Sequence, residues 1–338
     1  MSLINTPTNL VSNFNKNFSA FWQFSRPHTV IGTSLSVLAL FFISLAEMGG
    51  DRFNFPLGLY QYLKPNLTLY TTQLLATWLA CLAGNIYIVG LNQLEDIEID
   101  KINKPQLPLA SGAFSLQVGQ GIVAISGVLS LLIAAVSGKF LFLMVAISLI
   151  IGTAYSLPPI RLKRLPIFAA LCILIVRGLV VNLGLFFHFQ ATLFTGNLAS
   201  NLARNNLIIP NSIWVITWFI LVFTIAIALG KDIPDMEGDK QYQINTFTIK
   251  LGKQTVFNIC RAILTIAYLG MMIAGLIWLP QANLMFLVIS HSIALGLLWW
   301  QGWGVDLENQ EAIARFYQFI WKLFFMEYLI FPLACLWA

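Results

Sequence analysis

Nine long apolar runs divide this chain of 338 residues and restrict it to one class of fold. A helix needs about 20 apolar residues to cross the hydrocarbon core of a bilayer. Runs near that length cover residues 29–46, 71–93, 117–137, 140–156, 166–189, 213–230, 255–279, 282–301 and 316–337. Only 10% of the residues are charged, too few to cover the surface of a water-soluble domain. The sequence therefore predicts an all-α integral membrane protein with nine transmembrane helices.

Composition excludes two other classes of protein. The chain has 26 Phe and 10 Trp, more than a disordered protein carries. Its four cysteines are too few and too widely spaced for a disulfide scaffold. The first residues contain neither the apolar core of a signal peptide nor the many Arg of a transit peptide. We expect a cytoplasmic N-terminal tail over 1–28 and a single transmembrane domain over 29–338.

The basic residues of the loops predict the orientation. With nine spans, twelve of them share a side with the N-terminus, and four lie on the other side, namely Arg52, Lys64, Lys139 and Arg204. The N-terminus and the loops after the even-numbered spans are therefore expected in the cytoplasm. The net charge of +5 suits an anionic leaflet and anionic ligands. Nucleic acid is excluded as a partner because the basic residues are spread over short loops and form no stripe.

The acidic residues gather in two clusters on this same side. Their polar members are Asn92, Asp96 and Asp100 in the first cluster and Asp232, Asp235 and Asp239 in the second. On a continuous helix each set forms one stripe, because the spacing returns to the same face. Carboxylates four residues apart repel one another, so each stripe needs a counter-charge. Mg²⁺ prefers such oxygen ligands and is commonly shared between one or two carboxylates and a phosphate.

The two clusters also form an internal repeat. Asp96-Ile-Glu-Ile-Asp100-Lys101 matches Asp235-Met-Glu-Gly-Asp239-Lys240, and each is followed by an apolar stretch that ends in Gly. We expect two pseudo-repeated halves whose acidic stripes face one another around a shared pair of metal ions. The alternative interpretation is that both clusters are solvated loop caps.

A basic loop on the same side follows the fourth run. It contains Tyr155, the stiff dipeptide Pro158-Pro159, and three cations, Arg161, Lys163 and Arg164. Arg offers bidentate hydrogen bonds to a phosphate and Lys a point charge, so this loop suits a diphosphate. A plain topology signal is the alternative. Taken with the acidic clusters, the loop predicts binding of a magnesium diphosphate at the membrane surface.

Two charged residues fall inside predicted spans, where charge is costly and usually faces the interior of the bundle. Arg177 lies in the fifth run and Glu327 in the ninth. Arg177 either lines a cavity or pairs with a buried group such as Asn182 or Glu327. His28, beside Arg26 before the first run, is the one histidine placed to act on a substrate.

In this order the two acidic motifs and the basic loop resemble the signatures of the UbiA family of intramembrane aromatic prenyltransferases. The nine runs match the helical number of that family, so the resemblance covers nearly the whole chain. Longer tracts resemble its cyanobacterial, homogentisate-prenylating branch; they are 103–112, 177–184, 231–239 and 319–328. Gln93 departs from the family pattern, in which many members have Asp, and we assign it no ligand role.

The resemblance implies roles for individual residues. Two Mg²⁺ ions would be held by Asn92, Asp96, Asp100, Asp235 and Asp239. The diphosphate would be bound by Tyr155, Arg161, Lys163, Arg164 and Lys231. Asp232 would orient a ligand or accept the ring proton. From their positions in the sequence, and not from the resemblance, we expect Arg26, His28 and Arg177 to meet the aromatic substrate.

The resemblance also implies the reaction. A phytyl group would pass from phytyl diphosphate to homogentisate with loss of CO₂, giving the methyl-phytyl quinol of tocopherol synthesis in a cyanobacterial plasma or thylakoid membrane. The partners would be these substrates and the bilayer, without an obligatory protein partner. Geranylgeranyl or solanesyl donors and other aromatic acceptors are alternatives. An ion-coupled transporter built on repeats is the alternative from another class, although it predicts carboxylates near the bilayer midplane.

Overall fold

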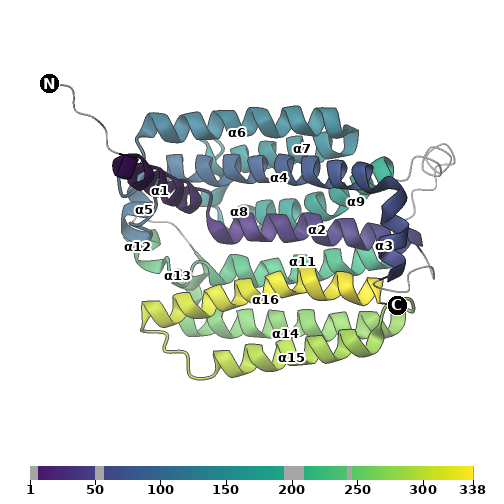
Figure 1. Cartoon of the computed structure of the whole chain (residues 1–338). Coiled ribbons are helices and arrows are strands. Elements are labelled where there is room, and N and C mark those ends of the chain that lie inside the picture. Colours follow the sequence, from purple (N-terminus) through teal and green to yellow (C-terminus); the bar gives the residue numbers. More distant parts are fainter. Residues whose placement is uncertain (1–6, 50–56, 194–208, 242–245, 338) are drawn as a thin grey trace.

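The computed structural model describes residues 7–49, 57–193, 209–241 and 246–337, and these residues contain helices and turns but no strand. Long helices lie side by side in a bundle (Figure 1). The elements are α1 (Pro7–Phe24), α2 (Pro27–Gly49), α3 (Leu57–Leu63), η2 (Lys64–Asn66), α4 (Leu67–Glu95), α5 (Ile97–Asn103), α6 (Leu116–Ser137), α7 (Lys139–Ser156), η3 (Leu162–Arg164), α8 (Pro166–Leu174), η4 (Ile175–Val180), α9 (Val181–Leu193), α11 (Asn211–Gly230), α12 (Met236–Gln241), α13 (Phe247–Leu251), α14 (Lys253–Trp278), α15 (Leu284–Gly302) and α16 (Gln310–Leu336).

Nine helical segments of the described residues are long and apolar enough to span a membrane, so the predicted helical membrane fold is confirmed. Two of them start more than two residues earlier than predicted. The second covers Gly58–Glu95, because α3 and the short turn η2 lead into α4 although their polar residues break the apolar run. The ninth begins at Gln310, where the side chain of Asn309 accepts hydrogen bonds from the first backbone N–H groups of α16.

Packing divides the bundle into two groups of helices joined by a central one. Helices α4, α6 and α7 contact one another on one side, and α11, α14, α15 and α16 form a chain of contacts on the other. Helix α2 packs against both α4 and α16 and so joins the groups (Figure 1). Small residues permit the closest approaches: a methyl group on Gly127 would lie 2.7 Å from the ring of Tyr87.

The short helices mark one end of the bundle. Helices α5, α12 and α13 lie at this end, whereas α3 lies at the opposite end (Figure 1). We call the first end the α5 end. Lys64, expected on the side opposite the N-terminus, directly follows α3, and Arg52 and Arg204 lie outside the described residues.

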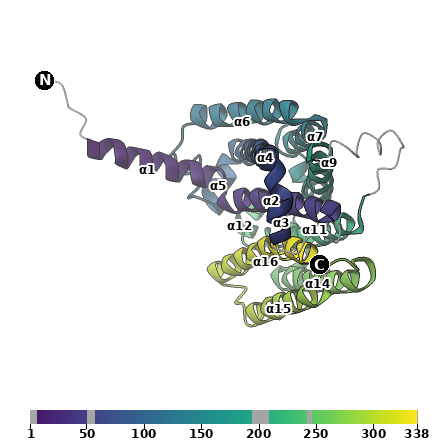
Figure 2. The ribbon, with the colours of Figure 1, turned by 45° about the vertical axis from the view of Figure 1, so that its right-hand side comes forward.

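The predicted N-terminal tail contains helix α1, which projects away from the bundle (Figure 2). Phe18, Phe21 and Trp22 are exposed on this helix. An amphipathic helix that immediately precedes the first span suits the interface between headgroups and acyl chains.

The fifth span is not a uniform α-helix. Between α8 and α9, the six residues of η4 form a π-helical segment. Such a segment contains an extra residue within the helix and is often found at functional sites. It places Arg177 in this irregular stretch.

Candidate active site

One cavity of about 1380 Å³ opens among α2, α4, α7, α8, α11 and α16. All the site residues that the sequence predicted line this cavity, although they come from five separate stretches of the chain. They are Arg26, His28, Asn92, Asp96, Asp100, Tyr155, Arg161, Lys163, Arg164, Arg177, Lys231, Asp232, Asp235 and Asp239.

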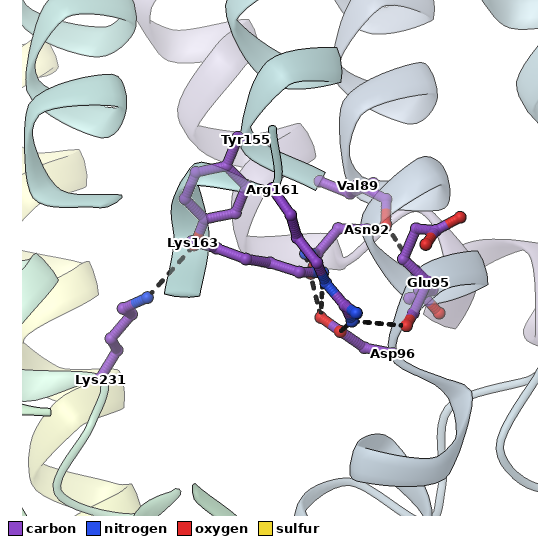
Figure 3. A network of polar contacts seen from close by, with 9 residues as sticks. Val89, Asn92, Glu95, Asp96, Tyr155, Arg161, Lys163 and Lys231 are labelled. Carbon is purple, nitrogen blue, oxygen red and sulfur yellow. Dashed lines mark hydrogen bonds and ion pairs between the residues drawn. The ribbon is translucent and has the colours of Figure 1, made fainter. Parts of the chain in front are cut away.

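The first acidic motif is not one helical stripe, so that part of the prediction is wrong. Helix α4 ends at Glu95, and Asp96 lies between α4 and α5 with φ −118° and ψ 19°. Arg161 Nη2 donates to the carbonyl oxygen of Glu95 at 3.0 Å, which satisfies a group that a continuing helix would have used. Asn92 and Asp96 nevertheless stay together, with Nδ2 of Asn92 3.1 Å from Oδ2 of Asp96 (Figure 3).

The second acidic motif departs from a stripe in the same way. Asp232 and Asp235 lie in the turns before α12, and only Asp239 is helical. The sequence contains the cause, because Pro234 has no backbone N–H to offer a helix through this stretch.

The two acidic motifs still resemble each other, because both interrupt the helix in the same way. In each motif one Asp stands before a short helix and the second Asp is buried within it. The backbone N–H of Asp100 donates to the carbonyl of Asp96 at 2.7 Å, and that of Asp239 to the carbonyl of Asp235 at 3.1 Å. Helices α5 and α12 contact each other, so the two motifs meet at the α5 end of the bundle.

The basic loop reaches directly to the first acidic motif. Lys163 Nζ lies 2.6 Å from Oδ2 of Asp96, and Arg161 Nη2 lies 3.1 Å from Oδ1 (Figure 3). Lys231 Nζ lies 3.4 Å from the hydroxyl of Tyr155. Arg164 is exposed at the cavity rim.

Two arginines of the cavity have strained backbones. Arg26 has φ +53° and Arg161 φ +38°, and in the described part of the chain these are the only positive φ values outside glycine. A left-handed backbone costs a non-glycine residue about 1–3 kcal/mol and is concentrated at functional sites. Both cases fall where the sequence nominated ligand-binding residues.

Burial shifts two carboxylates of the site towards their neutral forms. Burial raises the pKa of Asp100 to about 6, against the opposing charges of Arg26 and Lys104 and with smaller contributions from Asp96 and Asp235. Burial, with the charges of Asp235 and Asp232, likewise raises the pKa of Asp239 to about 7.

The cations respond to the same burial. Burial lowers the pKa of the Lys163 ammonium although Asp96 opposes this shift. The pKa of Lys231 is raised, chiefly by Tyr155 and against the effect of burial. Burial also raises the pKa of Asp232.

The donor set fits a hard divalent cation completed by a phosphate. Oδ2 of Asp100 is buried without a hydrogen-bond partner, which leaves an oxygen free to coordinate. Among the described residues, no three His, Cys, Asp or Glu side chains form a ready-made metal site. Mg²⁺ usually takes only one or two carboxylates and fills its remaining positions with water and substrate phosphate. Carboxylates split between two motifs therefore agree with this ion.

Lys104 belongs to the site although the sequence analysis did not nominate it. It forms an ion pair with Asp235 that ties the end of α5 to the second motif. Its position four residues after Asp100 was the available signal. Gln93 is buried and donates to the carbonyl oxygen of Phe24 at 2.7 Å, an internal contact that agrees with the absence of a ligand role.

Comparisons with known proteins extend along nearly the whole chain. The model of the UbiA prenyltransferase family matches residues 55–323. The chain is 54% identical to a homogentisate phytyltransferase from Synechocystis sp., over 94% of this chain and 96% of that protein. It is 36% identical to a homogentisate geranylgeranyltransferase from Triticum aestivum, over 94% of this chain and 73% of that protein.

A solved structure has the same fold. It is that of a UbiA homolog from Archaeoglobus fulgidus bound to GPP and Mg²⁺, with a TM-score of 0.58 and 15% identity over 94% of this chain and 100% of that chain.

Proposed function

The chain belongs to the UbiA prenyltransferase family, and from this premise we propose that it transfers a phytyl group from phytyl diphosphate to homogentisate. The product would be 2-methyl-6-phytyl-1,4-benzoquinol, for tocopherol synthesis. The convergence of two acidic motifs and a basic loop on one intramembrane cavity is the observation that carries the prenyl transfer. The choice of acceptor and donor is supported by the 54% identity to the Synechocystis protein.

We assign the metal to the residues nominated by the sequence. Asn92, Asp96 and Asp100 would hold Mg²⁺ on one side, and Asp235 and Asp239 on the other, with two ions in all. The solved homolog that contains GPP and Mg²⁺ supports a divalent metal in this family. When bound, the metal supplies Lewis-acid stabilisation of the departing diphosphate.

The cations of the cavity bind the diphosphate. Lys163, Arg161 and Lys231 have their charged groups at the mouth, close to the acidic motifs, where they can take up charge as the allylic C–O bond breaks. Arg164 and the hydroxyl of Tyr155 complete this set.

The apolar part of the cavity determines which group reacts with the allylic carbon. Its apolar wall excludes water, which would otherwise capture the cation that forms when the C–O bond breaks. The ring of homogentisate attacks this carbon and a C–C bond forms. The acetate carboxylate leaves as CO₂, and the proton on the attacked ring carbon moves to the former acetate carbon, which becomes the methyl group. Asp232 would assist this proton transfer, and Arg26 and His28 would meet the acceptor.

We propose the topology on the charge pattern. The protein is a multi-pass membrane protein. The charges of its loops support an N-terminus and an α5 end in the cytoplasm, in a plasma or thylakoid membrane, with residues 29–338 as one domain. The ion-coupled transporter is not supported, because the carboxylates gather at helix ends beside a basic loop.

The experiment is product formation in membranes that contain this protein, given homogentisate and phytyl diphosphate with Mg²⁺ or with a chelator. Magnesium-dependent methyl-phytyl quinol is the expected result. Geranylgeranyl diphosphate tested beside phytyl diphosphate decides the tail, since the wheat relative named for that donor is also similar. No product from homogentisate with any donor would overturn the proposal.

A further inference from the structure

A second cationic centre of the cavity lies apart from the basic loop. Arg177 belongs to the π-helical segment η4 and lines the cavity. Its guanidinium carbon lies 4.7 Å from the centre of the Trp321 ring and 5.4 Å from that of Phe324. Trp321 also contacts His28, whose ring lies 4.8 Å away. Arg177 thus lies against aromatic rings in the same cavity as the proposed chemistry.

The two internal partners that the sequence suggested for Arg177 are both engaged elsewhere. Glu327 Oε2 lies 3.0 Å from Nε2 of His291. Asn182 Oδ1 accepts a hydrogen bond from the hydroxyl of Tyr328 at 3.5 Å. Within the described residues, Arg177 takes part in no ion pair.

The guanidinium therefore retains unused hydrogen-bonding capacity. Its Nη1 is buried and has no hydrogen-bond partner. A charged group inside a membrane span is costly unless an anion or dipole compensates it. Stacking on aromatic rings orients the guanidinium but does not satisfy its N–H groups. These groups remain available to a planar anion that enters the cavity.

We propose that Arg177 binds the carboxylate of the aromatic acceptor and thereby selects acceptors that carry one; this inference rests on the proposed function. The substrates bring two anionic groups into the cavity. The diphosphate is matched by the acidic motifs with their metal and by the basic loop. The carboxylate of homogentisate is the remaining anion, and an arginine fork suits a carboxylate better than any other side chain. Trp321 and Phe324 keep that fork in place.

The test compares Arg177→Gln and Arg177→Lys with a matched control in the same chain. Arg261 is also stacked on aromatic rings, 4.1 Å from the centre of Trp299 and 5.5 Å from that of Phe257, but it does not line the cavity. Arg261→Gln therefore removes the same kind of interaction without touching the site. The KM values for homogentisate and for phytyl diphosphate are measured separately, together with turnover of methylhydroquinone, which is homogentisate without its carboxylate.

We expect Arg177→Gln to raise the KM for homogentisate about 10- to 100-fold, the range for loss of a charged hydrogen bond. In the same variant, the KM for phytyl diphosphate and the turnover of methylhydroquinone should change less than about twofold. In Arg261→Gln, both KM values and the turnover of methylhydroquinone should also change less than about twofold. The KM of Arg177→Lys for homogentisate should lie between those of the wild-type protein and Arg177→Gln, because lysine keeps the charge and lacks the two-pronged guanidinium. A homogentisate KM unchanged in both Arg177 variants, or an equal loss with methylhydroquinone, would overturn the inference.

Equilibrium dialysis of labelled homogentisate against the purified proteins separates this inference from the proposed function. If the wild-type protein forms no product, the proposed function fails. Weaker binding of homogentisate by Arg177→Gln would still support the inference, and equal binding would overturn it. If Arg177→Gln unfolds on extraction in detergent, the binding of homogentisate is measured with Arg177→Lys. Weaker binding than by the wild-type protein then supports the inference, and equal binding overturns it.

Discussion

Lys163 Nζ and Asp96 Oδ2 lie 2.6 Å apart, although 67 positions separate the two residues in sequence. The basic loop and the first acidic motif thus neutralise each other directly. Any metal ion that coordinates Asp96 must compete with this ammonium, and any phosphate that binds Lys163 must draw it from the carboxylate. The pair couples the two binding events.

Lys163→Met should therefore have opposite effects on the two ligands. We expect the substrate-free protein to bind Mn²⁺ several-fold more tightly, because a neighbouring positive charge is gone, and the KM for phytyl diphosphate to rise about tenfold. Electron paramagnetic resonance of Mn²⁺ measures the first effect and initial rates the second. Lys101→Met is the control, since Lys101 pairs with Glu98 on an exposed surface. Weaker Mn²⁺ binding by Lys163→Met would contradict the competition.

Asp239→Asn should abolish prenyl transfer and leave the fold intact. The substitution keeps the shape of the side chain and removes the charge that a metal needs, so a loss of about 100-fold or more in turnover is expected. Glu237→Gln, an exposed neighbour on the same short helix α12, should retain activity. Circular dichroism in detergent checks the fold of both variants. Near-normal turnover by Asp239→Asn would remove this residue from the metal site.

Stability should depend on pH with a defined sign. Asp100 and Asp239 have pKa values of about 6 and 7, above the ordinary value of 3.8, so the folded protein binds more protons than the unfolded chain between these limits. The free energy of unfolding therefore falls as pH rises through this window. We expect metal-free protein in detergent to unfold at a higher temperature at pH 5 than at pH 8.

Added Mg²⁺ should reverse that trend at pH 8, where both carboxylates are charged and able to coordinate. Asp239→Asn should flatten the dependence, because it removes the group with the larger shift. Thermal unfolding followed by tryptophan fluorescence measures both effects. A metal-free protein that becomes more stable from pH 5 to pH 8 would show that other groups dominate.

Gly178→Ala should disturb the π-helical segment beside Arg177. A methyl group at this position would lie 2.3 Å from Cδ2 of Leu221 and 2.7 Å from its Cγ, so either the Leu221 side chain or the pair of helices η4 and α11 must shift. We expect a loss of about 1–3 kcal/mol in stability together with weaker binding of homogentisate. Gly270→Ala is the matched control, because no atom lies within 4 Å of its added methyl group. It should be neutral or slightly stabilising, and a similar result for Gly178→Ala would indicate that η4 tolerates displacement.

The sequence predicted the features that depend on local composition. It could not predict the features that depend on contacts between residues distant in the chain. Apolar runs of bilayer length and the chemistry of carboxylates near cations are local properties, and they sufficed to predict the spans and a set of residues that line one cavity. The break at Asp96 could not be predicted, because it depends on Arg161 taking the carbonyl of Glu95 from a distant loop. The pair of Lys104 with Asp235 likewise requires α5 and α12 to meet.

The sequence of the second acidic motif contains a residue that disfavours the predicted helical stripe. Pro234 stands between Asp232 and Asp235, and a proline has no backbone N–H for the preceding turn of a helix. The π-helical segment gave no such sign, because an apolar run of Ile, Val and Leu with one isolated Gly is also tolerated in an ordinary α-helix.

The segment η4 also sets the angular phase of the span that contains it. One additional residue in a helix turns every later side chain by about 100° around the axis. Because η4 absorbs such a residue in its wider turn, α8 still lines the cavity and α9 still buries Leu185 and Phe189 completely in the core. A deletion of one residue between Ile175 and Val180 would convert this segment to an ordinary α-helical turn and leave α9 in register with the bundle. A deletion within α9 has no wide turn to compensate for it and would rotate the following side chains by about 100°, so η4 is the place where this span can change its number of residues without turning α9.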